Sequence, residues 1–290
     1  MFKKLKAIWE LTRLDHGIIY ALGVLLSLVI AYKGLPDYLA AAGGMIGAIL
    51  AEMGAFALND YFDVEVDKHN NRTDRPIVRG DISKEGALFI FFVTSFASLF
   101  FISLLGLGAV IVVVFLILFG AFYNYKLKEY GIWGNIYISF TMASPFLFGS
   151  VLFGSSAILI ILAVIAFIVG LGREIMKGIM DVKGDALRNV RTVARTMGEK
   201  NASLIAVGLY LIGILMAPIP FIVNLDAAYF HNIVYAAFAF GAILVLGYVC
   251  YRLLKSHDVK TVGAMRMYTL FAMLLALAAF FFGSFLHYGI

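Results

Sequence analysis

Apolar side chains run in long blocks along this chain, separated by short polar connections. Nine blocks approach the roughly 20 apolar residues that one helix needs to cross a bilayer. They cover residues 17–31, 39–58, 87–105, 109–125, 136–153, 157–172, 202–223, 233–254 and 265–287. Longer, charged connections lie at residues 60–85, 126–134, 181–201 and 255–264. The pattern predicts an all-α, polytopic membrane protein with about nine transmembrane helices.

Composition indicates the same class without any motif. Hydrophobic residues make up 62% of the 290 residues and charged residues 14%, whereas a soluble domain carries about 25% charged residues. The mean hydropathy is +0.95. No connection is long enough to hold a soluble domain, so we expect residues 1–290 to form a single membrane domain.

The N-terminal residues are basic, but Trp9, Glu10, Arg13 and Asp15 interrupt them before the first apolar block. That start is typical of a short amphipathic segment lying on the membrane and not of a cleavable signal peptide. Cys250 is the only cysteine, which excludes a disulfide framework and a thiol metal site. The net charge of +5 reflects membrane topology and does not indicate a nucleic-acid partner.

Basic residues gather on one side of the membrane when the N-terminus is placed inside and the helices alternate in direction. Only Lys33 then lies outside. The distribution predicts a multi-pass protein of the cell membrane, with a cytoplasmic N-terminus and an external C-terminus. No obligate protein partner is indicated.

An acidic cluster from Asn59 to Asp67 follows the second apolar block. On a helix at about 100° per residue, Asp60, Asp63 and Asp67 fall within a stripe of roughly 60° that Asn59 borders. Carboxylates on one face repel each other but are tolerated beside a divalent cation, and Mg²⁺ prefers carboxylates together with phosphate oxygens. The alternative is a solvated helix end capped by acids.

A second polar cluster closes the sixth apolar block. Four side chains share a helical face of roughly 80°, namely Glu174, Lys177, Asp181 and Asp185. Arginines follow each cluster, at Arg72, Arg75 and Arg79 and at Arg188, Arg191 and Arg195. Acids for a metal and arginines for phosphate are what a magnesium diphosphate needs. We therefore predict that both clusters face one central cavity, open on the cytoplasmic side.

These motifs resemble those of a known family. Asn59-Asp60-x-x-Asp63-x-x-x-Asp67, followed by Asp74-Arg75-Pro76-Ile77, resembles the first signature of the UbiA superfamily of intramembrane prenyltransferases. Asp181-x-x-x-Asp185 is similar to its second aspartate motif, and the nine-span layout is similar too. The resemblance implies that a polyprenyl diphosphate places its head in the cytoplasmic-side cavity and its tail among the helices.

The resemblance also implies roles for single residues. The Mg²⁺ ligands would be Asn59, Asp63, Asp67, Asp181 and Asp185. Asp60 would either bind the ion directly or support a ligand, and Arg72 and Arg75 would neutralise phosphate oxygens. The family also uses a Tyr-x-x-x-Lys pair near the fourth helix. In the local run from Tyr123 to Lys128 no tyrosine has a lysine four residues on, so the candidates are Tyr123, Lys126 and Lys128.

Two segments resemble the archaeal ether-lipid branch of the family. They are Arg173-Glu174-Ile175-x-Lys177 and the run from Arg75 to Gly80. That branch implies geranylgeranyl diphosphate as donor and geranylgeranylglyceryl phosphate, a membrane lipid, as acceptor. A second phosphate needs further cations, and Arg173 and Lys177, with Glu174 on their helix, are the candidates.

Two other functions are alternatives to this one. An aromatic quinone precursor such as 4-hydroxybenzoate is the alternative acceptor, and it would not need the second phosphate site. A cation transporter would place acids near mid-membrane without arginines, so the charge pattern disfavours it.

The sequence leaves two alternative roles open for each of two charged residues. Arg13 either reaches a phosphate or anchors the first segment on the inside face. Glu52, the only charge within its apolar block, either extends the polar lining of the cavity or bonds a neighbouring helix.

Overall fold

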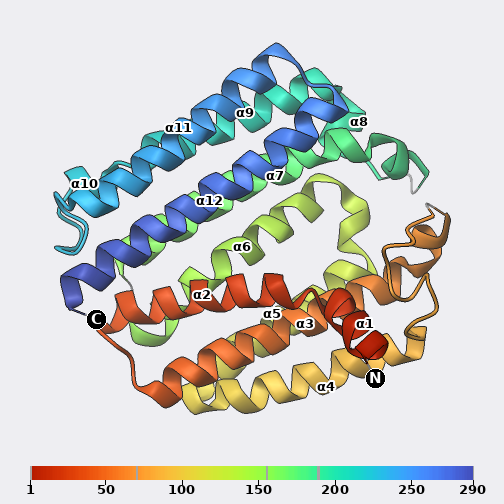
Figure 1. Cartoon of the computed structure of the whole chain (residues 1–290), viewed down its shortest axis with the longest axis horizontal. Helices are drawn as coiled ribbons and strands as arrows, with labels where there is room; N and C mark the ends of the chain where they lie inside the picture. Colours follow the sequence, from red (N-terminus) through yellow and green to blue (C-terminus); the bar gives the residue numbers. More distant parts are fainter. Residues whose placement is uncertain (1, 70, 155, 188–189, 290) are drawn as a thin grey trace. The chain divides into compact units, whose positions relative to one another are not determined.

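The computed structural model describes the chain except residues 1, 70, 155, 188–189 and 290, and leaves the side chains of residues 2, 153 and 183–187 undescribed. The described residues form helices and no strands (Figure 1). The first seven helices are α1 (Phe2–Thr12), α2 (Leu14–Tyr32), α3 (Tyr38–His69), α4 (Lys84–Ile102), η1 (Ser103–Leu105), α5 (Leu107–Tyr125) and η2 (Leu127–Tyr130). The others are α6 (Ile132–Phe153), α7 (Ala157–Leu187), α8 (Val193–Met197), α9 (Glu199–Met216), α10 (Ile219–Ile222), α11 (Ile233–Lys255) and α12 (Val259–Tyr288).

Nine helical segments within the described chain are long and apolar enough to cross a membrane, which confirms the all-α, nine-helix prediction. Two of them run well past their apolar blocks. α3 continues from Leu58 to His69, and α7 continues from Gly172 to Leu187. At 1.5 Å per residue these helices are about 48 and 46 Å long, against a hydrocarbon core of about 30 Å. The polar motif residues therefore belong to the same rigid helices as the membrane spans.

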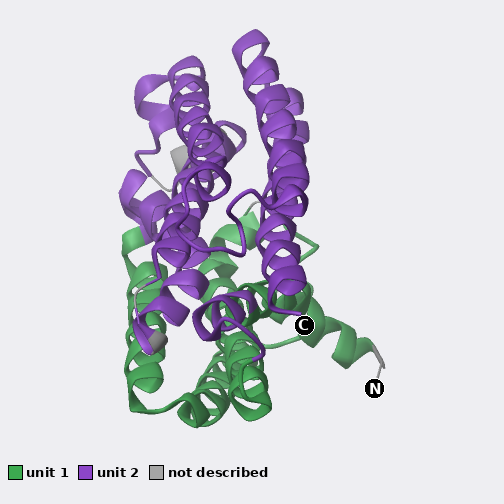
Figure 2. Ribbon diagram, turned by 90° about the vertical axis from the view of Figure 1, so that its left-hand side faces the viewer, with its two compact units in different colours: residues 1–25, 36–127 green, residues 26–35, 128–290 purple. Residues whose placement is uncertain are grey.

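The described chain divides into two compact units (Figure 2). Unit 1 contains residues 1–25 and 36–127, and unit 2 contains residues 26–35 and 128–290. The division falls inside α2. The expectation of a single membrane domain stays a prediction.

In unit 1, α3 and α4 pack closely because glycines line their contact. The Ser98 hydroxyl on α4 donates to the Gly47 carbonyl at 2.7 Å. A Cβ on Gly47 would lie 2.5 Å from Ile102 Cγ1, and a Cβ on Gly43 would lie 2.8 Å from the Phe101 carbonyl oxygen. Small residues that let backbones approach are the usual means of helix association in a bilayer.

A small apolar core joins the N-terminal helix of unit 1 to the loop that follows α3. Leu11 of α1 and Ile77 of the loop pack together with Ala57 and Val64 of α3 and Ala87 of α4. Leu11 is fully buried, and Ile77 is 8% exposed. The segment after the first acidic cluster is therefore held by packing as well as by its charges.

In unit 2, α6 contains Pro145, which lacks the amide hydrogen that would bond the Thr141 carbonyl. The Ser144 hydroxyl donates to that carbonyl at 2.8 Å. A hydroxyl in this position satisfies the freed group where no water is available.

The chain before α11 is tied to α12 by one asparagine. Asn232 Oδ1 accepts from the Val234 and Tyr235 amides at 2.9 and 3.1 Å, which makes it the N-cap of α11. Its Nδ2 donates to the Gly283 carbonyl of α12 at 3.3 Å. This one side chain thus closes a helix end and joins two elements.

Gly131, between η2 and α6, lies directly against the backbone of Arg191. Its φ is +56°, and a Cβ there would lie 2.0 Å from the Arg191 carbonyl oxygen. Only glycine allows this approach without a clash. The connection that begins α6 is therefore packed directly on the segment that follows α7.

Candidate active site

The first acidic cluster occupies the last turns of α3. Asp60 is 2% exposed and Asp67 6% exposed, while Asn59 and Asp63 are half-buried. The helix continues through all four residues. The expected stripe of polar side chains is therefore formed, on the part of α3 that extends beyond its apolar block.

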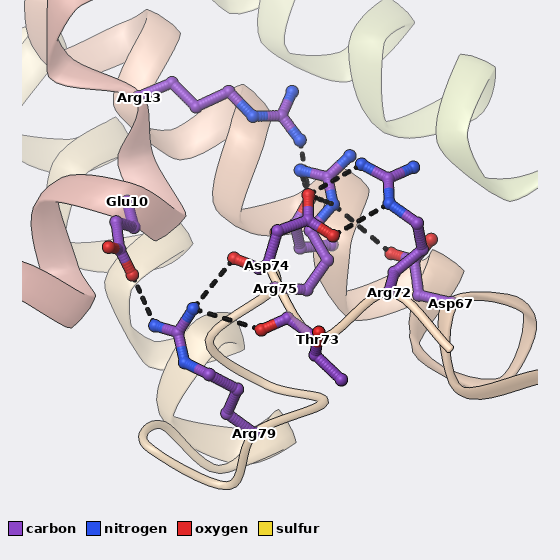
Figure 3. Close-up of polar contacts among 9 residues, drawn as sticks. Glu10, Arg13, Asp67, Arg72, Thr73, Asp74, Arg75 and Arg79 are labelled. Carbon is purple, nitrogen blue, oxygen red and sulfur yellow. Dashed lines mark hydrogen bonds and ion pairs between the residues drawn. The ribbon is translucent and has the colours of Figure 1, made fainter. Parts of the chain in front are cut away.

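Asp60 holds two arginines that are far apart in the sequence (Figure 3). Its Oδ1 lies 2.9 Å from an Nη of Arg13 and 3.2 Å from an Nη of Arg75. Its Oδ2 is buried and has no hydrogen-bond partner among the described residues. One carboxylate oxygen thus brings two guanidinium groups together, while the role of Asp60 towards an ion, as a direct ligand or as the support of one, stays a prediction.

Arg13 stands at the elbow between α1 and α2. Its φ of +45° is uncommon for a residue with a side chain and costs on the order of 1 kcal/mol. Its guanidinium lies 4.3 Å from the centre of the Phe56 ring and also contacts Asp60. These two contacts stabilise the strained backbone.

Arg72 and Arg75 pair with carboxylates of the loop and of α3. Arg72 makes a bidentate contact with Asp74: its Nε donates to Oδ1 at 2.9 Å and its Nη2 donates to Oδ2 at 2.8 Å. This hydrogen bonding holds the pKa of Asp74 below its usual value. Arg75 Nε lies 3.7 Å from Asp67 Oδ2 and 4.0 Å from Asp74 Oδ2. Both arginines are therefore held beside the first acidic cluster by carboxylates of the protein itself.

Asn59 has a partner that sequence reasoning missed. Its Nδ2 donates to Asn124 Oδ1 on α5 at 2.9 Å, and Asn124 Nδ2 donates to the Gly120 carbonyl at 3.0 Å. These two bonds fix the orientation of the Asn59 side-chain amide, because its Nδ2 must face Asn124 Oδ1. Its Oδ1 therefore remains an acceptor. The signal in the sequence was an asparagine at the end of the fourth apolar block, next to Tyr123.

The tyrosine and lysine candidates fall in different units. Tyr123 is half-buried and Lys126 exposed, both in unit 1, whereas the half-buried Lys128 belongs to unit 2. Their contact with a diphosphate stays a prediction.

The second cluster on α7 repeats the arrangement around Asp60. Glu174 is 7% exposed. Its Oε1 lies 3.1 Å from an Nη of Arg173, and its Oε2 lies 3.3 Å from Lys177 Nζ. Arg173 Nε is buried without a hydrogen-bond partner in the described part of the chain. A buried carboxylate again holds two cations, one of which keeps an unused donor.

The remaining residues of the second cluster are more open. Asp181 is exposed near the end of α7. The side chain of Asp185 and the whole of Arg188 lie outside the described residues. Asp63 and Asp181 belong to different units, so the expectation that the two clusters share one ion stays a prediction.

Unit 1 also has an open hollow of 490 Å³ next to the first cluster. It is lined by Trp9, Glu10, Arg13, Asp15, Asp74 and Arg75. Among the described residues, no three His, Cys, Asp or Glu side chains are placed to hold a metal ion unaided.

Comparison with known proteins decides the family. Residues 20–275 match the model of the UbiA prenyltransferase family. This chain belongs to the UbiA prenyltransferase family. The resemblance carried by the two aspartate motifs is confirmed.

Relatives in this family cover nearly the whole chain. The chain is 43% identical to a digeranylgeranylglyceryl phosphate synthase of Archaeoglobus fulgidus over 283 residues, which are 97% of this chain and 96% of that relative. It is 28% identical to the protein of the same name from Thermococcus kodakarensis, over 96% of this chain and 98% of the relative.

Solved UbiA structures have the same fold. A structure from work on digeranylgeranylglyceryl phosphate synthase in membranes matches with a TM-score of 0.78 and 26% identity, covering 97% of this chain and 98% of that chain. A UbiA homologue from Archaeoglobus fulgidus bound to GPP and Mg²⁺ matches with a TM-score of 0.71. It is 15% identical over 94% of this chain and 99% of that chain, so it bears on the fold alone.

Proposed function

We propose that this UbiA-family membrane protein transfers a geranylgeranyl group from its diphosphate to the free hydroxyl of geranylgeranylglyceryl phosphate, a step of ether-lipid synthesis. One observation carries the choice of acceptor. The 43% identity to a digeranylgeranylglyceryl phosphate synthase extends over 97% of the chain. The alternative acceptor, an aromatic quinone precursor, has no comparable support.

The residues at the end of α3 fit Mg²⁺. Asn59 Oδ1 remains an acceptor, Asp63 and Asp67 supply carboxylates, and the buried Oδ2 of Asp60 has no hydrogen-bond partner in the described chain. This is an all-oxygen donor set, which hard divalent cations require, and Mg²⁺ takes its remaining ligands from substrate phosphate and water. Asn59, Asp63 and Asp67 would hold the ion in unit 1, and Asp181 and Asp185 in unit 2. The chemistry supplied by bound Mg²⁺ is Lewis-acid stabilisation of the charge on the departing diphosphate.

The arginines of unit 1 stabilise the same charge directly. Arg13 and Arg75 are fixed on Asp60 before substrate arrives, so little reorganisation is needed when the allylic carbon–oxygen bond breaks. The allylic cation that remains would react with water, so the transfer needs a site from which apolar side chains exclude water. The acceptor hydroxyl then attacks the cation and forms the ether carbon–oxygen bond, and its proton passes to the departing diphosphate.

The cations of unit 2 suit the acceptor. Glu174 holds Arg173 and Lys177 side by side, and this pair would bind the single phosphate of geranylgeranylglyceryl phosphate. An aromatic acceptor would leave the pair without a ligand.

Charge distribution supports a cytoplasmic N-terminus and a cytoplasmic active site. The C-terminus would then lie outside, after nine crossings. Reaction of single cysteines at the two ends with an impermeant maleimide, in a Cys250→Ser background, distinguishes this orientation from its inverse.

The test uses purified protein in detergent with Mg²⁺ and geranylgeranyl diphosphate. Either geranylgeranylglyceryl phosphate or 4-hydroxybenzoate is added, and the product is identified by mass. A digeranylgeranylglyceryl phosphate product supports the proposal, and prenylated hydroxybenzoate alone contradicts it. Asp63→Ala and Asp181→Ala should each abolish magnesium-dependent turnover, whereas unchanged activity in both would refute the two-cluster site. Lys177→Ala should raise the acceptor KM more than the donor KM.

A further inference from the structure

Arg79 is the centre of a contact network that the proposed chemistry does not use. On one side it bonds the loop after α3: Nη1 donates to the carbonyls of Thr73 and Asp74 at 3.3 and 3.0 Å, and Nε donates to Asp81 at 2.7 Å. On the other side an Nη contacts the carboxylate of Glu10 on α1. Figure 3 shows the Arg79 side chain lying between Glu10 and the backbone of Thr73 and Asp74.

Further contacts join the same two segments. Lys3 of α1 lies 3.0 Å from Asp81. Below these charges, Leu11 and Ile77 pack in one apolar core. α1 therefore contacts the loop through three of its residues, Lys3, Glu10 and Leu11.

The two docked segments each carry one arginine of the site. Arg13 follows the last residue of α1, and Arg75 lies in the loop, between the two carbonyls held by Arg79 and the buried Ile77. Both guanidinium groups end on the same Oδ1 of Asp60. The relative position of α1 and the loop thus sets the spacing of the two guanidinium groups.

We propose that Glu10 and Arg79 are positioning residues that clamp α1 onto the loop and so pre-organise Arg13 and Arg75 for the diphosphate. Neither residue is among those assigned above to Mg²⁺ or to the two phosphate groups. The inference rests on the proposed function, since it assigns the two arginines to that diphosphate. It also gives α1 a part in the site, whereas the sequence indicated only a segment lying on the membrane.

A purely structural role is the competing interpretation. The side chains of Arg79 and Glu10 are 31% and 29% exposed, and ion pairs this accessible to solvent add little to overall stability. The clamp should therefore change the affinity for diphosphate more than it changes the stability of the fold. This difference is what the experiment measures.

The variants are Glu10→Gln, Arg79→Met and the double variant, with Glu10→Asp as the conservative replacement. Glu65→Gln is the matched control, because Glu65 pairs with Lys68 at 3.2 Å on the exposed face of α3 and does not reach the loop. Hydrogen–deuterium exchange of residues 71–82 reports the loop, and calorimetry with magnesium pyrophosphate reports binding. Donor KM and kcat are then measured, together with the Tm in detergent.

We expect faster exchange of residues 71–82 in Glu10→Gln and Arg79→Met. We also expect about fivefold weaker pyrophosphate binding and a donor KM raised by a similar factor, as loss of about 1 kcal/mol would give. The Tm and kcat should stay close to those of Glu65→Gln. Glu10→Asp should recover most of the affinity, and the double variant should be no worse than Arg79→Met, because the two residues act through one contact.

Exchange and pyrophosphate affinity equal to wild type would overturn the proposal, as would a loss of kcat at unchanged donor KM. Failure of the wild-type protein to transfer a prenyl group to any acceptor would instead contradict the proposed function. The exchange and pyrophosphate measurements would still decide the clamp in that case.

Discussion

Asp60→Asn is the sharpest test of the site in unit 1. The substitution keeps the volume of the side chain and removes its charge, so Arg13 and Arg75 lose the anion that both contact at 2.9 and 3.2 Å. Removing one partner of a buried ion pair costs about 3–5 kcal/mol. The two arginine side chains are 21% and 20% exposed, so we expect the lower end of that range, about 3 kcal/mol.

The functional cost follows from the same contacts. Two like charges without their shared carboxylate move apart, and the diphosphate meets arginines that are no longer pre-organised. We expect kcat/KM for the prenyl donor to fall about 100-fold, which corresponds to about 2.7 kcal/mol of transition-state stabilisation. Thermal unfolding in detergent and steady-state transfer from geranylgeranyl diphosphate measure the two effects.

The magnesium dependence of the variant separates the two roles of Asp60. If Asp60 supports the arginines, the Mg²⁺ concentration for half-maximal rate stays near wild type while the donor KM rises. A large increase in that Mg²⁺ concentration would show instead that Asp60 is a ligand of the ion. Glu65→Gln, 75% exposed on the same helix, is the control, and a variant that keeps its Tm and its kcat/KM would refute the reasoning.

Three further predictions concern stability. Gly131→Ala should destabilise the protein by about 3 kcal/mol or more and lower its Tm, because the new Cβ meets the Arg191 carbonyl at 2.0 Å in a backbone conformation that favours glycine; an unchanged Tm would contradict the contact. Asn232→Ala should cost about 1–2 kcal/mol in thermal unfolding, because the N-cap of α11 and the bond to Gly283 are lost together, and Asn232→Asp should recover the cap alone. Asp258 caps α12, and hydrogen bonds, first from Ser256, hold its pKa well below the usual value. Asp258→Ala should therefore lower the Tm at pH 7, and the difference from wild type should shrink as the pH falls below about 4 towards the depressed pKa.

The membrane spans could be predicted from sequence because a bilayer imposes a length and an apolar composition on each helix. All nine apolar blocks became helices, and their starts and ends agree within a few residues at most boundaries. The largest differences are at the ends of α3 and α7, which run well past their blocks. Smaller ones are the end of α9 at Met216 and the start of α12 at Val259. Hydropathy marks where a helix leaves the hydrocarbon, and it does not mark where the helix ends, since residues such as Glu65 and Lys68 are compatible with helix in water.

The chemistry of the site was predictable from local spacing, but its partners were not. Helical periodicity alone placed Asp60, Asp63 and Asp67 on one stripe of α3. The contacts Asn59–Asn124 and Glu10–Arg79 join residues 65 and 69 positions apart, and no local pattern reports such pairs. Arg13 kept two interpretations from sequence, and the structure adds its ion pair with Asp60.

The role of Glu52 stays open after the structure is considered. It lies half-buried within α3, inside the apolar block. Its two interpretations, cavity lining and a bond to a neighbouring helix, both stay predictions.

Because α3 and α7 are longer than the hydrocarbon layer is thick, the rate of the reaction should depend on the thickness of the bilayer. Each helix exceeds the thickness of the hydrocarbon layer by at least about 16 Å. The carboxylates of the two motifs lie on the turns that extend beyond this layer. A thicker or thinner bilayer changes the tilt of such helices. Turnover in vesicles should accordingly vary with the acyl-chain length of the lipid.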